Sequence, residues 1–543
     1  MLLVYGPRST DYDFGPDHPL TPRRFGPGID LLGAVGALPG LAPEPAPDEH
    51  LRWCHAPDYI RVVRAFSERP DGPPARGIAT GGDDPPFAGM HEAAAAVAGG
   101  SIAAMEAILR GDVEHAHHPG GGLHHAMADR AAGFCIYDDP ALAIARARAA
   151  GLRVMYVDLD VHHGDGVQAL HWTDPGVLTV SIHESGRTLF PGTGSIDEVG
   201  EGTAAGTSVN LPLPAGTGEG AWLDALTGLL PELAATFGPD VVVSQHGADS
   251  HAWDPLAHLA ITTTAHGAAA RLVDRLAHRY AGGRWLATGG GGYDVYRVVP
   301  RTWALTWLAG AHREVPAETP PAWRERWAAD AARHGQAPPP ATFDDPPDAG
   351  EVLDPLTQVR ARAVAAEVRA GLVPRLVREA TDRGWWDPRA ADPARAAARR
   401  SAGDGAAPPD GVPSVRVVAD RAAWDRLVLP ARVMPPFEPW LAHDIVGRAV
   451  EAGASATAAV VGDRVVGLAV AADGELLAVG VAPAWRRRGL ATALLGALAD
   501  AGVRSLAVRW TVAERDVVDP LPVADRRAIA RRLVARVGAG SGA

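Results

Sequence analysis

The sequence predicts an α/β fold, a parallel sheet sandwiched by helices over residues 1–330, followed by a smaller α+β domain. In the first region, short apolar runs without strict alternation are separated by Ala- and Leu-rich stretches of helical length. This pattern is typical of strands buried on both faces. Residues 414–543 hold 17 Arg against 13 Asp and Glu, whereas the whole chain has a net charge of −13. The change of sign indicates a separate module with a different ligand.

The expected elements follow one another in the order that this fold requires. In the first region we expect strands at 154–157, 177–180, 241–243 and 285–287, and helices at 140–150, 221–237 and 265–281. Strands that alternate with helices imply a parallel sheet, whose ligands bind beyond the carboxyl ends of the strands. In the last region, strand-like runs lie at 415–418, 458–461, 464–470 and 476–481. We therefore predict a first domain over 1–387, a Pro-, Ala- and Gly-rich linker over 388–413 and a second domain over 414–543.

Composition excludes several classes of protein. A chain of 543 residues with 47% hydrophobic residues can bury more than one core. The net charge of −13 argues against a nucleic-acid binder that depends on phosphate neutralisation. Two cysteines, Cys54 and Cys135, suit a reducing compartment. The N-terminus does not resemble a signal peptide, and the apolar segment 92–109 is interrupted by Gly99, Gly100 and Glu106, so we expect no membrane span and a cytoplasmic location.

Polar side chains cluster where two of the predicted strands end. Asp158, Asp160 and His162 follow the strand at 154–157, and alternation places them on one face. Asp160 and His162 would supply a carboxylate oxygen and an imidazole nitrogen, which suit zinc and other first-row divalent ions. Asp249, after the strand at 241–243, either completes a three-ligand site or caps a helix. Three protein ligands leave a position open for water, as in a catalytic site.

A second group of histidines follows a glycine loop. His124 and His125 are metal ligands, a solvated run or acid–base groups, and Asp158 and Asp165 remain free to orient them. The nearby His115, His117 and His118 are expected on the solvated surface, because no second ligand set is apparent for them.

A run of four glycines, 289–292, ends at Tyr293 and follows the strand at 285–287. Glycine allows the backbone to approach a ligand closely, and Tyr293 can donate a hydrogen bond to a developing oxyanion. A metal, a carboxylate-supported His and this Tyr together indicate hydrolysis of an amide or an ester.

These stretches resemble the zinc-dependent histone deacetylase family, and more closely its bacterial acetoin-utilisation branch. The matching segments, in family order, are DHPLTP (17–22), GMHEAAAAVAGGS (89–101), GGLHHA (121–126), GFCIYDD (133–139), DLDVHHGDGV (158–167), SIHESGRTLFPGTG (181–194), QHGAD (245–249) and GGGGYD (289–294). The resemblance implies an arginase/deacetylase-type fold and a metal-dependent deacetylase.

The resemblance also implies a role for each matching residue. Zinc, which iron(II) can replace, would bind Asp160, His162 and Asp249, and a potassium ion would lie near Asp158, Asp160, His162 and Ser181. His125 would be the general base and acid, paired with Asp165, and His124 an electrostatic His paired with Asp158, while Tyr293 would stabilise the oxyanion. The acyl-lysine tunnel would be lined by Gly133, Phe134, Phe190 and Leu256. Asp84, or else Asp83, would hold the substrate backbone at the rim.

A single metal is expected at this site. The related binuclear sites of arginase type need extra carboxylates, but Gly164 and His251 stand two residues after His162 and Asp249. Both bridging carboxylates are missing, which favours deacylation over guanidino hydrolysis.

The second domain resembles the GNAT acetyltransferase superfamily around one motif. A strand, an arginine run and a glycine-led helix supply the expected acetyl-CoA-binding residues Val481, Arg486, Arg487, Arg488, Gly489, Leu490 and Ala491. Backbone N–H groups at the start of such a helix can cradle a pyrophosphate. Residues 414–543 contain no Tyr, so the general acid common in these enzymes is absent, and Glu451, Glu475 and Glu514 remain alternative bases.

Two functional hypotheses remain. In the first, the chain deacetylates acetyl-lysine on proteins, with acetyl-CoA synthetase as the target that the resemblance suggests, and its GNAT module binds acetyl-CoA and transfers acetyl groups. In the second, it hydrolyses small acetylated amines such as acetylpolyamines, attracted by the acidic first domain, and the GNAT module only senses acetyl-CoA.

Overall fold

The computed structural model divides into two compact units, Met1–Ala398 and Arg399–Ala543. It describes residues 1–346, 349–350, 354–382, 414–425, 427, 446, 450–451, 453–461, 464–472, 475–481, 493–494, 497–498, 505–512 and 515–522. The predicted linker 388–413 lies outside the described residues, so its boundaries stay a prediction.

The first unit is built on an eight-stranded sheet in the order β2-β1-β3-β8-β7-β4-β5-β6, in which every pair is parallel. The strands are β1 (Leu2–Val4), β2 (Pro39–Leu41), β3 (His115–His118), β4 (Val154–Asp158), β5 (Val177–Glu184), β6 (Ser208–Leu213), β7 (Val241–Gln245) and β8 (Trp285–Thr288). All four strands predicted for this region are present. The α/β class is therefore confirmed.

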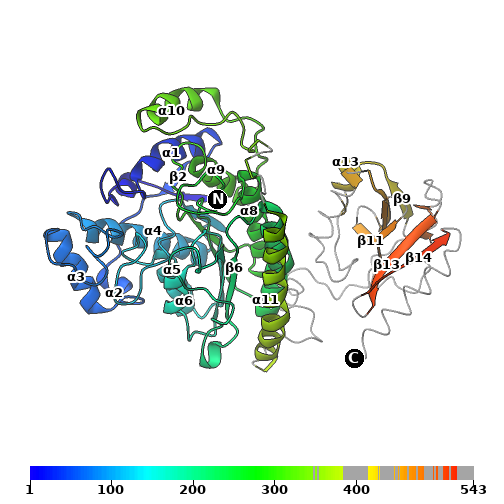
Figure 1. The fold of residues 1–543 in the computed structure, drawn as a ribbon, viewed down its shortest axis with the longest axis horizontal. Helices are drawn as coiled ribbons and strands as arrows, with labels where there is room; N and C mark the ends of the chain where they lie inside the picture. Colours follow the sequence, from blue (N-terminus) through cyan, green and yellow to red (C-terminus); the bar gives the residue numbers. More distant parts are fainter. Residues whose placement is uncertain are drawn as a thin grey trace. The chain divides into compact units, whose positions relative to one another are not determined.

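Helices cover both faces of this sheet (Figure 1). They are α1 (Phe25–Ala34), α2 (Asp48–Leu51), α3 (Pro57–Glu68), α4 (Met90–Arg110), α5 (Asp139–Ala149), α6 (Asp165–Leu170), α7 (Glu219–Phe237), α8 (Thr263–Tyr280), α9 (Val299–Gly310), α10 (Pro321–Arg333) and α11 (Pro355–Asp382). Adjacent residues of β1 belong to different cores: Leu3 packs with α1 and α9, and Val4 packs with α4 and α5. Because successive strand residues point to opposite faces, these helix pairs cover opposite sides.

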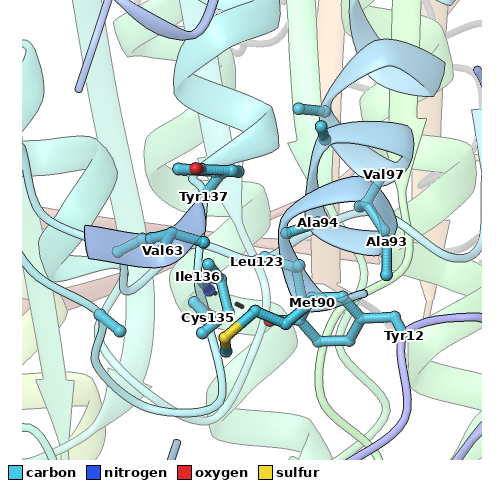
Figure 2. Close-up of a cluster of buried hydrophobic side chains, with 14 of the residues drawn as sticks. Tyr12, Val63, Met90, Ala93, Ala94, Val97, Leu123, Cys135, Ile136 and Tyr137 are labelled. Carbon is cyan, nitrogen blue, oxygen red and sulfur yellow. Dashed lines mark hydrogen bonds between the residues drawn. The ribbon is translucent and has the colours of Figure 1, made fainter. Parts of the chain in front are cut away.

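Helix α4 is the one described helix that is long and apolar enough to cross a membrane, and 72% of its apolar window is buried inside the unit. Met90, Ala94 and Val97 pack with Tyr12 and Tyr137 in the cluster of Figure 2. The glycines of this segment serve packing, because a side chain at Gly99 would meet the backbone of Glu44. The helix is therefore explained as part of a protein core.

The expectation that His115, His117 and His118 lie on the solvated surface is wrong. They form β3, between β1 and β8, and each side chain is at most 4% exposed. Burial lowers the pKa of His118 to about 3 and that of His117 well below its usual value, so both are neutral. Neutral imidazoles can enter a sheet core, and His118 Nδ1 lies 2.8 Å from Ser101 Oγ.

The second unit contains a six-stranded sheet in the order β14-β13-β12-β11-β10-β9. Its strands are β9 (Ser414–Val418), β10 (Ser455–Val461), β11 (Arg464–Ala472), β12 (Glu475–Val481), β13 (Ser505–Val512) and β14 (Arg515–Pro522), and the short helix α13 spans Arg421–Asp425. All neighbours pair antiparallel except β12 and β13, which are parallel. Each of the four strands predicted for this region lies within an observed strand.

Candidate active site

Two loops at the carboxyl ends of adjacent strands bring the predicted metal ligands together. Asp160 and His162 lie between β4 and α6, and Asp249 follows β7. Strands β4 and β7 pair in register, with Asp158 opposite Gln245. Because the sheet is parallel, side chains that follow both strands emerge at one edge.

The candidate metal cluster consists of Asp160, His162 and Asp249. His162 Nδ1 lies 3.0 Å from Asp160 Oδ1 and 3.2 Å from Asp249 Oδ2. The remaining carboxylate oxygens accept hydrogen bonds: Asp160 Oδ2 from Gly291 N (2.9 Å) and Asp249 Oδ1 from Val161 N (3.0 Å). These bonds fix the carboxylates so that one oxygen of each faces the imidazole.

The donor set fits a divalent ion. One ligand atom from each of the three residues lies within 4.8 Å of the others, and all three residues are buried. Burial disfavours a charged His162, but Asp160 and Asp249 raise its pKa to about 10. Two buried carboxylates thus demand positive charge at this point, which a first-row divalent ion supplies with the O and N ligands that it prefers.

The two adjacent histidines have different environments. Burial opposes protonation of His124, but Asp158, 2.8 Å from its Nδ1, and Asp160 raise its pKa to about 10. His125 Nδ1 lies 2.6 Å from Asp165 Oδ1, and burial together with the charge of His124 lowers its pKa to about 4. At neutral pH His124 is therefore a cation and His125 a neutral imidazole. Groups whose environments separate their pKa values in this way are suited to distinct roles in acid–base chemistry.

The glycine run lets the backbone close over the carboxylates. A Cβ at Gly291 would meet Asp249 Oδ2, and one at Gly289 would meet the carbonyl of Pro119. Tyr293, at the end of the run, is 7% exposed and its N–H donates to Asp254 Oδ2 (2.8 Å). Burial and the nearby carboxylates raise the pKa of Tyr293 well above its usual value, so its hydroxyl stays a hydrogen-bond donor.

A cavity of about 20 Å³ joins these groups, which is room for about one water molecule. Its lining includes His124, His125, Asp160, His162, Tyr293, Gly133 and Phe134. A side chain at Gly133 would meet the rings of His125 and Phe190, so this glycine keeps the passage open. The Phe190 ring lies 5.0 Å from that of His125, and Leu256 packs against the cluster that contains Phe134 and Tyr293. Of the four expected tunnel residues, Gly133 and Phe134 thus line the cavity and Phe190 lies beside the His125 ring, while a tunnel role for Leu256 stays a prediction.

The two rim candidates differ in exposure. Asp83 is exposed, whereas Asp84 is 2% exposed and its Oδ1 has no hydrogen-bond partner among the described residues. Burial, and then the charge of Asp83, raises the pKa of Asp84 to about 8. Contact of Asp84 with a substrate stays a prediction.

The expected potassium and single-metal features also have structural counterparts. Ser181 on β5 pairs with Asp158 in register, so it lies beside the carboxylate that the potassium prediction names. At Gly164 a side chain would meet Asp158 Oδ2, and His251 Nε2 lies 2.8 Å from Asp345 Oδ2. Neither position offers a carboxylate for a second ion at the cluster.

Sequence reasoning missed three residues of the site. The Arg24 guanidinium is 4% exposed and donates to the carbonyl of Gly290 (2.6 Å), which holds the glycine run. Gln245 Nε2 donates to Asp160 Oδ2 (2.6 Å), and Asp254 accepts from the Tyr293 backbone. Gln245 lies within a quoted motif, but no pattern distinguishes Arg24 from the other arginines of the chain.

Of the predicted acetyl-CoA-binding residues, the structure describes only Val481, which ends β12. Arg486, Arg487, Arg488, Gly489, Leu490 and Ala491 lie outside the described residues, so their role stays a prediction.

Comparison with known proteins assigns both units. The histone deacetylase domain matches residues 18–309, and the acetyltransferase (GNAT) family matches residues 426–517. The acetoin utilization protein AcuC of Bacillus subtilis is 42% identical over 355 residues, which are 64% of this chain and 90% of that protein. AcuC of Staphylococcus xylosus is 35% identical over 60% of this chain and 86% of its own length.

Solved structures agree with the sequence matches. A histone deacetylase (HDAC) homolog complexed with SAHA superposes with a TM-score of 0.59 at 28% identity, over 68% of this chain and 99% of that one. An HDAC homolog from Aquifex aeolicus gives a TM-score of 0.57 at 28% identity, over 66% and 99% of the two chains. The resemblance drawn from the motifs is confirmed. The chain belongs to the histone deacetylase family, as a deacetylase that carries a GNAT domain after its catalytic unit.

Proposed function

We propose that the chain is a zinc-dependent protein lysine deacetylase whose GNAT domain binds acetyl-CoA. The observation that carries this proposal is the convergence of the Asp160–His162–Asp249 cluster with a narrow cavity lined by the carboxylate-paired His124 and His125 and by Tyr293. A divalent ion bound at the cluster would polarise the amide carbonyl and make a water molecule more acidic.

The residues around the cluster then have distinct roles in the reaction. Asp165 accepts a hydrogen bond from Nδ1–H of His125, which leaves Nε2 free to take a proton from the attacking water. His124, kept cationic by Asp158, stabilises the negative charge that develops on the substrate. Tyr293 donates a hydrogen bond to the oxyanion, and His125 returns its proton to the departing amine. The narrow cavity, whose lining includes Gly133 and Phe134, excludes bulk water from these steps.

The kind of acetylated substrate is tested by kinetics on two probes. We expect kcat/KM for an acetyl-lysine peptide to exceed that for an N-acetylated diamine. A large preference for the diamine would replace the protein-directed proposal with the small-amine alternative. That alternative rests on the acidity of the chain outside residues 414–543, which attracts cations. Tyr293→Phe serves as the low-activity control for both probes.

The GNAT domain is tested in the full chain. Isothermal titration with acetyl-CoA should give saturable binding, which Arg487→Glu weakens if residues 486–491 hold the pyrophosphate. Acetyl transfer is measured in the Tyr293→Phe background, so that the first unit does not remove the product. Binding without transfer would make this domain a sensor, and no binding would contradict the proposal.

The domain boundaries 1–387, 388–413 and 414–543 belong to this proposal. Trypsin should cut first at the arginines of 388–413, among them Arg389 and Arg395, and release two stable fragments. First cuts at other positions would contradict the proposed linker boundaries.

A further inference from the structure

A second group of metal-ligand side chains lies at the amino edge of the large sheet, which is the edge where its parallel strands begin. His115 begins β3, Asp274 and His278 lie one turn apart near the end of α8, and His312 follows the end of α9. Helices α8 and α9 lie side by side (Figure 1). One ligand atom from each of the four residues lies within 4.8 Å of all the others. Because β3 and β8 run parallel, this edge is opposite the one that carries the active site.

The separations match those in a tetrahedral metal site. Four ligands at Zn–N and Zn–O distances of about 2.0–2.1 Å lie about 3.3 Å from one another. His312 Nε2 lies 3.1 Å from His278 Nε2 and 3.1 Å from Asp274 Oδ1. Asp274 Oδ1 also lies 3.6 Å from His278 Nε2 and 3.8 Å from His115 Nε2. The four atoms thus surround a point that one ion can occupy after small side-chain adjustments.

The buried nitrogen of His115 indicates that a cation belongs there. Its Nδ1–H donates to the carbonyl of Gly310 (2.7 Å), so the neutral ring presents an Nε2 lone pair to the cluster. This Nε2 has no hydrogen-bond partner within the part of the chain that the structure describes, although His115 is only 4% exposed. A lone pair that faces the Asp274 carboxylate is repulsive, and a bound cation turns both groups into ligands. The bond to Gly310 is also the kind of contact that orients a ligating histidine.

His312 occupies a backbone conformation that glycine normally takes. Its φ is +53°, in the left-handed region, two residues after the end of α9. A non-glycine residue is uncommon there, and such strain persists only where the surrounding structure holds it. In this turn the strained residue directs its Nε2 at the other three donors.

We infer that these four residues form a structural site for a first-row divalent metal ion, with zinc as the probe of choice. Three imidazoles and one carboxylate supply four protein ligands. As in structural zinc sites, no coordination position is left open for water. The site is distinct from the three-ligand cluster of the active site. The ion joins β3, α8 and the segment after α9, which are distant in sequence, and so stabilises the first unit.

The test counts ions in the full chain after removal of metal with EDTA and titration with Zn²⁺. The key variant is the double change His278→Gln, His312→Gln. These side chains are 39% and 53% exposed, so the changes should not disturb the core. His50→Gln is the matched control, because His50 is a partly exposed histidine outside both clusters. Asp249→Asn isolates the new site by weakening the other one.

The wild type and His50→Gln should bind two Zn²⁺ per chain, and the double variant one. With Co²⁺, Asp249→Asn should show the visible absorption of a tetrahedral site, and adding the double change to Asp249→Asn should abolish that absorption. At saturating Zn²⁺ the double variant should deacetylate within about twofold of the wild-type rate, because its changes are remote from the reacting atoms. Zinc should raise the thermal midpoint of Asp249→Asn.

A wild-type chain that binds one Zn²⁺, or a double variant that still binds two, would overturn the inference. Matching circular dichroism of all metal-free variants excludes misfolding as the cause of a lost ion. The result does not depend on the proposed substrate, because each readout except the rate is independent of catalysis.

Discussion

Histidine and aspartate cluster both at the carboxyl edge of the eight-stranded sheet, where its parallel strands end, and at its amino edge, where they begin. The two clusters differ in the number of each residue type and in the side chains around them. At the carboxyl edge, two carboxylates and one imidazole meet beside a histidine pair, a tyrosine and a narrow cavity. At the amino edge, three imidazoles and one carboxylate meet between a strand and the ends of two helices. Ligand type alone therefore does not distinguish the sites. The number of protein ligands and the proton-transferring neighbours separate a reactive centre from a structural one.

The largest expected loss of activity follows substitution of a metal ligand at the carboxyl edge. Asp249→Asn should lower kcat/KM by about 10³ or more, because a bound divalent ion supplies several kcal/mol of charge stabilisation. EDTA should abolish activity in the wild type, and Zn²⁺ should restore it. Deacetylation that survives both treatments would show that this cluster is not the reactive centre.

Loss of one hydrogen-bond donor at the same edge should cost less. Tyr293→Phe keeps the ring but removes the hydroxyl, and we expect kcat to fall by about 10²–10³, as for other lost oxyanion donors. The KM should change little. Tyr296→Phe is the control, because the Tyr296 hydroxyl lies 2.6 Å from Asp330 Oδ2, on α10. Equal effects of the two changes would argue against a role for Tyr293 in the transition state.

A smaller effect is expected for the carboxylate that orients His125. Asp165→Asn removes the charge 2.6 Å from Nδ1, and the rate should fall by about 10–100-fold, as for other groups that orient a functional histidine. Because the buried His125 has a pKa of about 4, it stays neutral well below pH 6.5, and loss of Asp165 should lower that pKa further. The pH–rate profile measures this change. A shift of the acid limb to higher pH would contradict it.

The carboxyl edge could be predicted from the sequence and the amino edge could not. Asp158, Asp160 and His162 lie within five residues, so strand alternation alone places them on one face. The amino-edge ligands come from positions 115, 274, 278 and 312, and only Asp274 and His278 share a helical spacing. The sequence predicts a solvated His115, because a run of histidines gives no sign that it forms an interior strand of the sheet.

The burial of individual polar side chains could also not be predicted from the sequence. Arg24 and Asp84 are polar residues that usually lie on the surface, and only the folded chain shows them at 4% and 2% exposure. The strands, in contrast, were found because a fully buried parallel sheet has short apolar runs with few polar interruptions.

Buried histidines outside both clusters serve as a control for the comparison. The smallest predicted effect is the contribution of one of them to the pH dependence of stability. Burial lowers the pKa of His171 to about 4, and its Nε2 lies 3.3 Å from the carbonyl of Ala141. The unfolded chain, with a His pKa of about 6.5, binds more protons between these values, so the stability contribution is present above pH 6.5 and is lost as the pH falls toward 4. Between pH 7 and pH 5 the loss is about 2 kcal/mol.

In His171→Gln this loss should disappear, so the free energy of unfolding should change by about 2 kcal/mol less between pH 7 and pH 5 than in the wild type. Urea unfolding followed by tryptophan fluorescence measures both values, and His50→Gln should leave the wild-type difference intact. A metal-bound histidine is likewise kept neutral, but by its ion, so zinc should make the stability of Asp249→Asn more dependent on pH. An unchanged pH dependence in His171→Gln would mean that burial does not keep this histidine neutral, and the contrast between solitary and clustered histidines would fail.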